Sequence, residues 1–183
     1  AYQVIAFDDD DPDVYVQHGS DNITTASITV PIEEVDANKT MLFFTTDAHY
    51  QINGVEAYYM VDGEVTNNTA LTFRMANTSA YPVRIKWYLV EFLNMFADSV
   101  QRGRLEAVAT ATNSTSLGTA LYNMTTMPIL SASGPTTSTN AAYLYNVAWT
   151  GQFAPASGTP ETINTINFSR YTGNLRPSNI SWQ

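Results

Sequence analysis

Short runs of β-branched and aromatic residues recur along this chain and constrain its fold more than any other feature. In the first half the runs are ASITVPI (26–32), TMLFFTT (40–46), VEAYYMV (55–61), TALTFRM (69–75) and VRIKWYLVEF (83–92). The pieces between them, such as DANK, QING, VDGE and MANTSAYP, have turn-like compositions. Residues of these types are enriched in strands, and this spacing is typical of sandwiches and barrels. The sequence therefore predicts an all-β fold.

One strand motif occurs whole in the middle of the chain and divided between its two ends. In RIKWYLVEF (84–92), Ile85, Trp87 and Leu89 alternate with polar residues, as in a half-buried strand. From Val90 the apolar phase shifts by one residue, which predicts a β-bulge. NISWQ (179–183) resembles the first half of the motif, and AYQVIAF (1–7) resembles the second half.

Further matches at a nearly constant offset indicate an internal repeat of about 85 residues. VYVQHG (14–19) matches DSVQRG (98–103), LTFRM (71–75) resembles INFSR (166–170), and Phe7 matches Phe92. We therefore expect two related β-sandwich-like units, with a jelly roll as one form that they can take. The predicted boundaries are an N-terminal strand and acidic loop at 1–13, a first unit at 14–97 and a second unit at 98–183.

The divided motif leaves two arrangements open. The N-terminal strand completes the second unit of its own chain, which needs the two ends to lie close together. Alternatively, it completes a unit of a neighbouring subunit, as in donor-strand complementation.

Composition excludes several classes of function. The 183 residues include no Cys, which excludes disulfides, zinc-thiolate sites and thiol nucleophiles. The net charge is −9 and only Lys39 and Lys86 are lysines, so we expect no nucleic-acid partner. An acidic balance also disfavours anionic membranes, and no apolar run is long enough to span a bilayer. The sequence contains no nucleotide-binding, metalloprotease or serine-elbow motif, so we expect that the protein is not an enzyme.

The first unit resembles a loosely described set of phage and prokaryotic surface proteins. The resemblance lies in SITVPIEEVDANKTMLFF, TALTFRM, VRIKWYLVEF and DSVQRG, and it covers about residues 14–104. The second unit fits weakly, because ALYNMTTMPIL replaces the V-D-x-x-K element. The resemblance implies structural use on a virion or cell surface and a β-sandwich loosely similar to H-type lectins. It implies no catalytic residues.

The acidic run FDDDDPDVY (7–15) is a candidate calcium site. Its carboxylates at Asp8, Asp9, Asp10, Asp11 and Asp13 are oxygen donors of the kind that calcium prefers. The spacing does not fit an EF-hand loop, and a solvated, self-repelling loop is the alternative interpretation. We expect no other cofactor.

Apolar residues in two segments are candidates for a subunit interface. LNMFAD (93–98) is expected to form a loop, and exposed apolar loops tend to mark subunit contacts. The alternative is that this loop folds onto its own sandwich. The six candidate interface residues are Val4, Ile5, Phe7, Leu93, Met95 and Phe96.

Two repeated features are expected to be structural. V-Q-[HR]-G occurs as Val16–Gly19 and Val100–Gly103, which suggests a turn whose glycine adopts a backbone conformation that a Cβ would forbid. The glutamines of this motif are expected to bond neighbouring backbone. Trp87 and Trp182 occupy equivalent positions in the repeat, which favours the core over a sugar-binding platform.

Asn-x-Ser/Thr occurs eight times, at Asn22, Asn38, Asn67, Asn77, Asn113, Asn123, Asn167 and Asn179. The composition predicts about three by chance, so the excess suits a glycosylated surface protein, although a Ser/Thr/Asn-rich phage protein would show it without glycans.

We therefore expect a structural subunit of a repetitive assembly at a virion surface or in the extracellular space. Its partners would be copies of itself and other structural subunits, with a glycan as a further partner. The leading form is a virion protein of a tailed virus, as a head-surface (capsid) decoration or a tail component. The alternatives are a donor-strand-linked archaeal or bacterial filament subunit and a lectin-like carbohydrate-binding module.

Overall fold

A computed structural model describes residues 13–48, 60–75, 82–94, 100–122, 129–133, 149–156, 159–170 and 178–183. These residues form strands and one short 3-10 helix, and none of their helices is long and apolar enough to cross a membrane. The first half contains β1 (Val14–Ile23), β2 (Ser27–Pro31), η1 (Ala37–Lys39), β3 (Thr40–Ala48), β4 (Val61–Asn67), β5 (Ala70–Met75) and β6 (Val83–Phe92). The second half contains β7 (Gly103–Val108), β8 (Thr112–Tyr122), β9 (Leu130–Ser133), β10 (Thr150–Ala156), β11 (Thr159–Ser169) and β12 (Ser178–Trp182).

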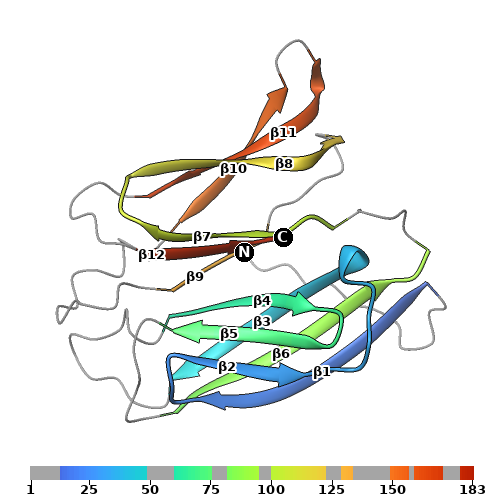
Figure 1. Cartoon of the computed structure of the whole chain (residues 1–183), viewed down its shortest axis with the longest axis vertical. Coiled ribbons are helices and arrows are strands. Elements are labelled where there is room, and N and C mark those ends of the chain that lie inside the picture. The colour runs from blue at the N-terminus through green and yellow to red at the C-terminus, as the bar shows by residue number, and fades with distance from the viewer. Residues whose placement is uncertain are drawn as a thin grey trace, which may run out of the picture.

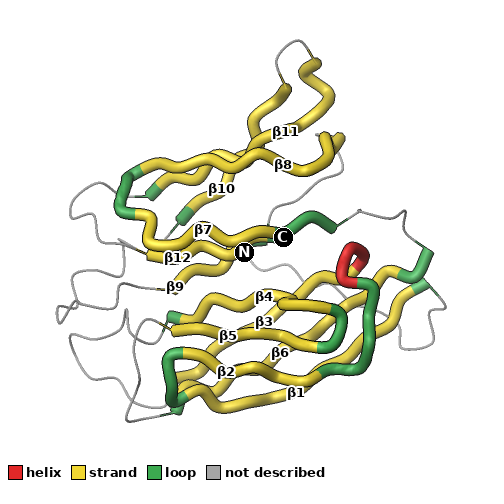
Figure 2. Tube along the Cα trace, viewed as in Figure 1, coloured by secondary structure: helices red, strands yellow, loops and turns green. Residues whose placement is uncertain are grey.

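The strands form four antiparallel sheets of three strands, which lie in layers (Figures 1 and 2). We name them sheet A (β1-β6-β3), sheet B (β2-β5-β4), sheet C (β7-β12-β9) and sheet D (β10-β11-β8). Sheets A and B enclose one apolar core, and sheets C and D enclose a second. Contacts of β4 with β9 and β12, together with hydrogen bonds from the second half to the backbone of the edge strands β3 and β4, place sheet C against the β3–β4 edge of the first sandwich (Figure 1). The all-β, sandwich-like fold predicted from the sequence is confirmed.

The two halves have the same strand order. In each half the first, sixth and third strands form one sheet, and the second, fifth and fourth strands form the other. The registers agree as well, since Gly19 pairs with Trp87 as Gly103 pairs with Trp182. The extent of the sequence repeat and the jelly-roll form stay predictions.

The strand β6 shows why the first core forms where it does. Val83, Ile85, Trp87 and Leu89 are buried, whereas the alternating residues Arg84, Lys86 and Tyr88 are exposed. This confirms the predicted alternation. The predicted bulge is wrong, because the pairing of β6 with both neighbours runs without a register shift. Val90 is buried on the face opposite Leu89, so the apolar phase changes because both faces of the strand are covered there.

Two further local predictions are corrected by the structure. VDGE (61–64) is not a turn but the start of β4, where Gly63 packs against Phe44 and Phe73. The first V-Q-x-G motif lies within β1, and the second leads into β7. The polar residues and glycines of VDGE and of the V-Q-x-G motifs predict turns. Contacts with residues distant in the chain hold these segments extended instead.

The glycines of the V-Q-x-G motifs leave room for a tryptophan ring. A Cβ on Gly19 would lie 2.5 Å from the Trp87 ring, and a Cβ on Gly103 would lie 2.6 Å from the Trp182 ring. Neither glycine has a left-handed backbone, so the expected conformational role is wrong and close approach is the cause. Both tryptophans are buried, as the repeat predicted.

We predict that Gly19→Ala and Gly103→Ala each lower the free energy of unfolding by about 1–3 kcal/mol, because the added methyl overpacks a fixed indole ring. Urea unfolding followed by tryptophan fluorescence measures the loss. Gly118→Ala is the matched control, since its Cβ would meet its nearest neighbour at 3.7 Å. Equal stabilities for all three variants would contradict the prediction.

Candidate functional site: the interface between the two halves

Polar contacts join the edge strands β4 of sheet B and β3 of sheet A to the second half. The Gly63 N–H donates to the Ser131 hydroxyl at 3.2 Å, and this hydroxyl donates back to the Gly63 carbonyl at 3.4 Å. The side-chain amide of Gln183 likewise binds the backbone N–H and carbonyl of Leu42. Side chains of the second half therefore satisfy the hydrogen bonding of backbone N–H and carbonyl groups in the first half.

A buried carboxylate, Asp62 on β4, lies at the centre of this interface. Asp62 is 0% exposed, and it accepts hydrogen bonds from Ser133 at 2.5 Å and from Ser181 at 3.2 Å. Its Oδ1 atom also lies 3.6 Å from Arg74 Nη1 and 3.5 Å from Arg104 Nε. One carboxylate therefore meets hydroxyls of the second half and guanidinium groups of both halves.

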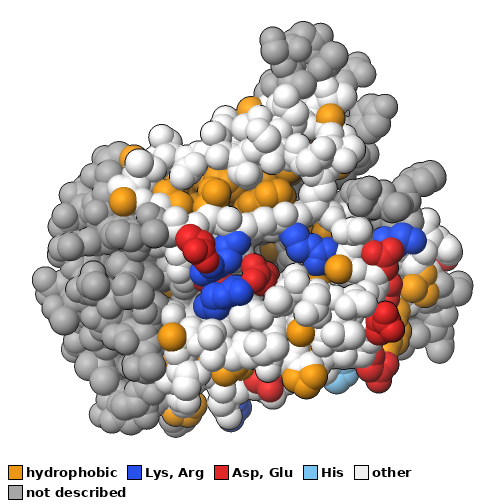
Figure 3. Space-filling view, in the orientation of Figure 1, with side chains coloured by type: hydrophobic (Ala, Val, Ile, Leu, Met, Phe, Trp, Pro, Cys, Tyr) orange, Lys and Arg blue, Asp and Glu red, His pale blue; other side chains and the backbone are white. Residues whose placement is uncertain are grey.

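The two arginines that face Asp62 each have a second, more exposed acidic partner. Arg74 bonds Glu64 at 2.5 Å, and Arg104 bonds Glu106. The space-filling view shows this acidic and basic group in the middle of one face, between the halves (Figure 3). Because a buried charge is costly unless it is paired, the cluster favours one relative placement of the two sandwiches.

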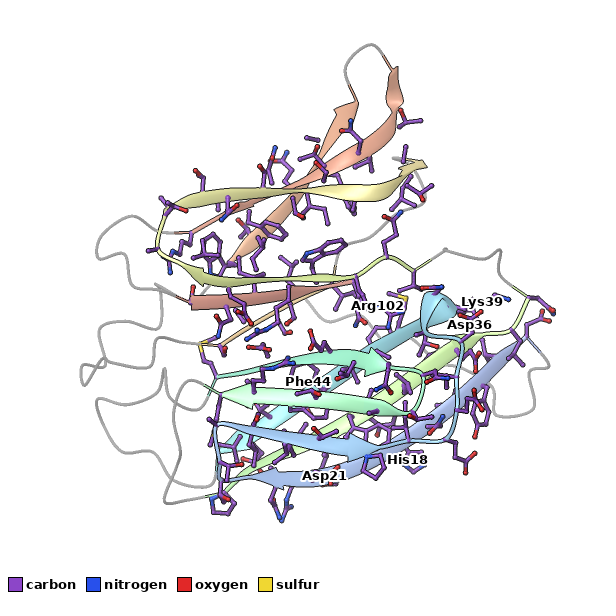
Figure 4. The ribbon with its side chains drawn as sticks, viewed as in Figure 1. His18, Asp21, Asp36, Lys39, Phe44 and Arg102 are labelled. Carbon is purple, nitrogen blue, oxygen red and sulfur yellow. The ribbon has the colours of Figure 1, made fainter. Side chains whose placement is uncertain are left out.

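Arg102 adds a further basic group where the second half begins. Its Nη1 donates to the Val65 carbonyl at 3.3 Å, while its Nη2 is buried without a hydrogen-bond partner. Burial lowers the pKa of Arg102, and the carboxylates of Asp36 and Glu64 oppose this shift. Figure 4 shows Arg102 beside Asp36 and the short helix η1.

An acidic surface hollow lies next to η1. It is lined by Glu34, Val35, Asp36, Ala37, Asn38, Asn68 and Glu91. The Glu91 carboxylate accepts a hydrogen bond from the Asp36 N–H at 2.7 Å, so it supports the backbone before η1. The described residues contain no group of three or more metal-ligating side chains, in this hollow or elsewhere.

The glutamines of the V-Q-x-G motifs bind backbone in the same way in both halves. Gln17 bonds the N–H and carbonyl of Glu33, at 2.9 and 3.0 Å. Gln101 bonds the N–H and carbonyl of Thr119, at 3.2 and 2.7 Å. The expected glutamine–backbone bond is confirmed, although its partners lie 16 and 18 residues away in the chain. Next to the first of these sites, the Tyr15 hydroxyl donates to Glu33, which raises the pKa of Tyr15.

The end of the second core is polar where the first core is aliphatic. Arg170 is 7% exposed, and it donates to the carbonyls of Val108 and Thr110 at 2.8 and 3.0 Å. It also donates to the Ser178 hydroxyl at 3.0 Å and stacks over the Trp149 ring at 4.6 Å. Burial lowers the pKa of Arg170. By register, Trp149, Arg170 and Ser178 match the buried residues Val61, Met75 and Val83.

The predicted site residues are only partly described by the structure. For the calcium site, Asp8, Asp9, Asp10 and Asp11 lie outside the described residues, and Asp13 is exposed and accepts from Asn94. For the subunit interface, Val4, Ile5, Phe7, Met95 and Phe96 lie outside the described residues. Leu93 is 44% exposed, which leaves it available for a contact.

Six of the eight Asn-x-Ser/Thr asparagines are described. Asn22, Asn38, Asn67 and Asn167 are exposed, and Asn113 and Asn179 are partly buried. Asn77 and Asn123 lie outside the described residues.

Sequence reasoning missed the charged residues at the interface. Asp62, Arg74 and Arg104 sit on strands of a chain in which only 14% of residues are charged. A charge within an apolar strand of such a chain is unusual, and that pattern was the available indication. Their convergence depends on the packing of sheet B on sheet C, which no local pattern contains.

No family model matches the chain, and no curated protein or solved structure matches it significantly. The functional argument therefore depends on the geometry of the chain itself.

We predict that Asp62→Asn lowers the free energy of unfolding by about 3–5 kcal/mol, because it leaves the Arg74 and Arg104 charges without their shared partner. Chemical denaturation measures the change. Glu106→Gln is the control, since this carboxylate is 71% exposed and exposed ion pairs contribute at most about 1 kcal/mol. A loss for Asp62→Asn no larger than that of the control would contradict a central role for Asp62.

We also predict that Arg170→Met, which introduces the first half's residue, costs about 2–4 kcal/mol because it leaves buried carbonyls and the Ser178 hydroxyl with fewer partners. Adding Ser178→Val removes one of these unsatisfied groups, so the double variant should be more stable than Arg170→Met alone. Thermal and urea unfolding of the four members of this cycle test the coupling. Simple additivity would mean that Arg170 and Ser178 do not act together.

Proposed function

We propose that the protein is a structural subunit of a repetitive extracellular assembly, and that the assembly is a filament joined by strand donation. In this proposal residues 4–7 of each following chain extend β12 in sheet C of the chain before it. The observation that carries the proposal is the difference between two otherwise matching strands, β6 and β12.

The two strands correspond up to their tryptophans. Trp87 packs on Gly19 in sheet A, and Trp182 packs on Gly103 in sheet C. Beyond Trp87, β6 continues through Tyr88–Phe92 and pairs with β1 and β3 over this length. Beyond Trp182, the N–H and carbonyl of Gln183 bond Ile129. The sequence that resembles Leu89–Phe92 stands instead at Val4–Phe7.

A donated strand suits this position in the sheet. The added backbone would bond the strands on either side, and its alternating side chains would enter the core. The resemblance between the segments aligns Val4 with Leu89, which is 1% exposed in the first core. Gln183 already occupies the position that corresponds to Tyr88, so the donated pairing would begin at Val4. Val4 would therefore point inward, and Gln3 would precede the donated strand.

The composition supports an extracellular assembly. The chain is rich in Ser, Thr and Asn and only 14% of its residues are charged, and four of the described Asn-x-Ser/Thr asparagines are exposed. An assembly exposed to solvent on many copies needs such polar coverage, and glycans on these asparagines would add to it.

We predict that deletion of residues 1–7 gives folded monomers that no longer polymerise. Val4→Asp should cut assembly at least tenfold, because a carboxylate would enter the core, while the matched control Gln3→Asp should assemble like the wild-type chain. Circular dichroism checks the fold, and negative-stain electron microscopy with sedimentation measures assembly.

The outcomes separate the candidate functions. Unfolding of the truncated chain would show that the strand serves its own molecule. Micrographs of the native particle that show a virus head or tail in place of a filament would support the virion protein instead.

A further inference from the structure

We infer that each filament subunit docks on the next through a second copy of the contact that joins its own two halves. In this contact the edge strand β10 of sheet D meets the outer faces of β3 and β6 in sheet A of the following chain. This inference rests on the proposed function, and it specifies the surface and the partner that the filament uses.

The sheet registers define which residues correspond. Asp62 and Gly63 on β4 match Thr150 and Gly151 on β10, because Gly63 pairs with Phe73 as Gly151 pairs with Phe168. The glycines also have matching neighbours. A Cβ on Gly63 would lie 2.8 Å from Phe44, and a Cβ on Gly151 would lie 2.8 Å from Leu130. Phe44 and Leu130 are themselves equivalent, since they pair with Trp87 and Trp182.

On the opposite side of the contact, residues of sheet C correspond to residues of sheet A. Ser131, Ser133 and Ser181 of sheet C face β4 in the existing interface. By register they match Thr45, Asp47 and Lys86 of sheet A. These three residues are exposed, as is Thr150 on β10. Thr150 on the edge strand β10 and the outer face of sheet A therefore both lie open to solvent.

The hydroxyl and carboxylate partners of the existing contact are kept when the residues are exchanged, whereas Arg74 and Arg104 become Ser169 and Ser20. The Gly63 backbone and the Ser131 hydroxyl become the Gly151 backbone and the Thr45 hydroxyl. The Asp62 carboxylate and the Ser133 hydroxyl become the Thr150 hydroxyl and the Asp47 carboxylate, so donor and acceptor trade sides. Ser181, which donates to Asp62, becomes Lys86, which would donate to Thr150.

No charge is left isolated in the exchanged contact. Arg84 lies opposite Asp47 in the pairing of β3 with β6, and Lys86 is two residues further along the same strand. The carboxylate that enters the contact therefore has cationic neighbours from its own sheet. This arrangement meets the requirement that charges in an interface are paired.

The connecting segments support the same geometry. In the chain, Phe92 ends β6 and Gly103 begins β7 eleven positions later. Across a donated strand, Phe7 would end the completed strand and Gly19, the match of Gly103, follows twelve positions later. Connections of nearly equal length join equivalent strands, so the next chain's first half can sit on sheet D as sheet C sits on sheet B.

A contact of this kind repeats from chain to chain. The two surfaces differ, so the interface is heterologous, and each added subunit presents a fresh sheet D for the next. A heterologous contact gives an open filament when its rotation does not close a ring.

The test uses the absence of cysteine in the chain. A Thr150→Cys/Asp47→Cys variant is assembled into filaments, treated with a short bis-maleimide, and separated on a denaturing gel. We expect the monomer band to convert into a ladder of covalent multimers. Thr150→Cys/Asn68→Cys is the matched control, because Asn68 lies in the exposed turn between β4 and β5, away from the outer face of sheet A. It should give no ladder.

The readouts separate the two levels of the argument. Filaments that form normally, with both introduced thiols open to a fluorescent maleimide and no ladder, would overturn this docking contact and leave strand donation intact. If the wild-type chain forms no filaments, the proposed function fails, and this contact fails with it. Ladder formation that disappears when residues 1–7 are deleted supports both.

Discussion

The structure depends on an indole ring that lies directly on the backbone of the neighbouring strand. In each sandwich the central strand of one sheet carries a tryptophan that covers a glycine of the strand beside it. Because a Cβ at that glycine would overlap the ring, this pairing admits one register. Once the register is fixed, Ile85, Trp87 and Leu89 of β6 and Ile180 and Trp182 of β12 face their cores.

The interface between the halves follows from these registers. The outward positions of β4 and β12 bring Asp62 and Ser181 together only when both central strands are correctly placed. A buried carboxylate between two guanidinium groups contributes little net stability relative to an apolar contact, but it penalises every other placement strongly. The cluster around Asp62 therefore contributes more to fixing one arrangement of the two halves than to the strength of their association. The proposed contact between subunits uses the same positions with neutral and charged groups exchanged.

Sequence reasoning succeeded where the determinant was local. Alternation along 83–92 located β6 at its observed bounds, and the runs at 26–32 and 69–75 located β2 and β5 to within a residue. It failed at VDGE, whose glycine and acidic residues resemble a turn. Those residues are held extended because Gly63 packs against aromatic rings and Asp62 meets arginines from two strands distant in the chain. The candidate site was missed for the same reason, since no residue in it contacts another through sequence proximity alone.

The sequence by itself determined the all-β class, the alternation of the strands and the burial of Trp87 and Trp182, because these follow from side-chain periodicity and composition. It also pointed to equivalent tryptophans and V-Q-x-G motifs in the two halves. Only the tertiary structure decided why the motif needs glycine, which backbone its glutamine binds, and where the charges converge. Those outcomes depend on distances between strands that are far apart in the chain, and local pattern contains no information about such distances.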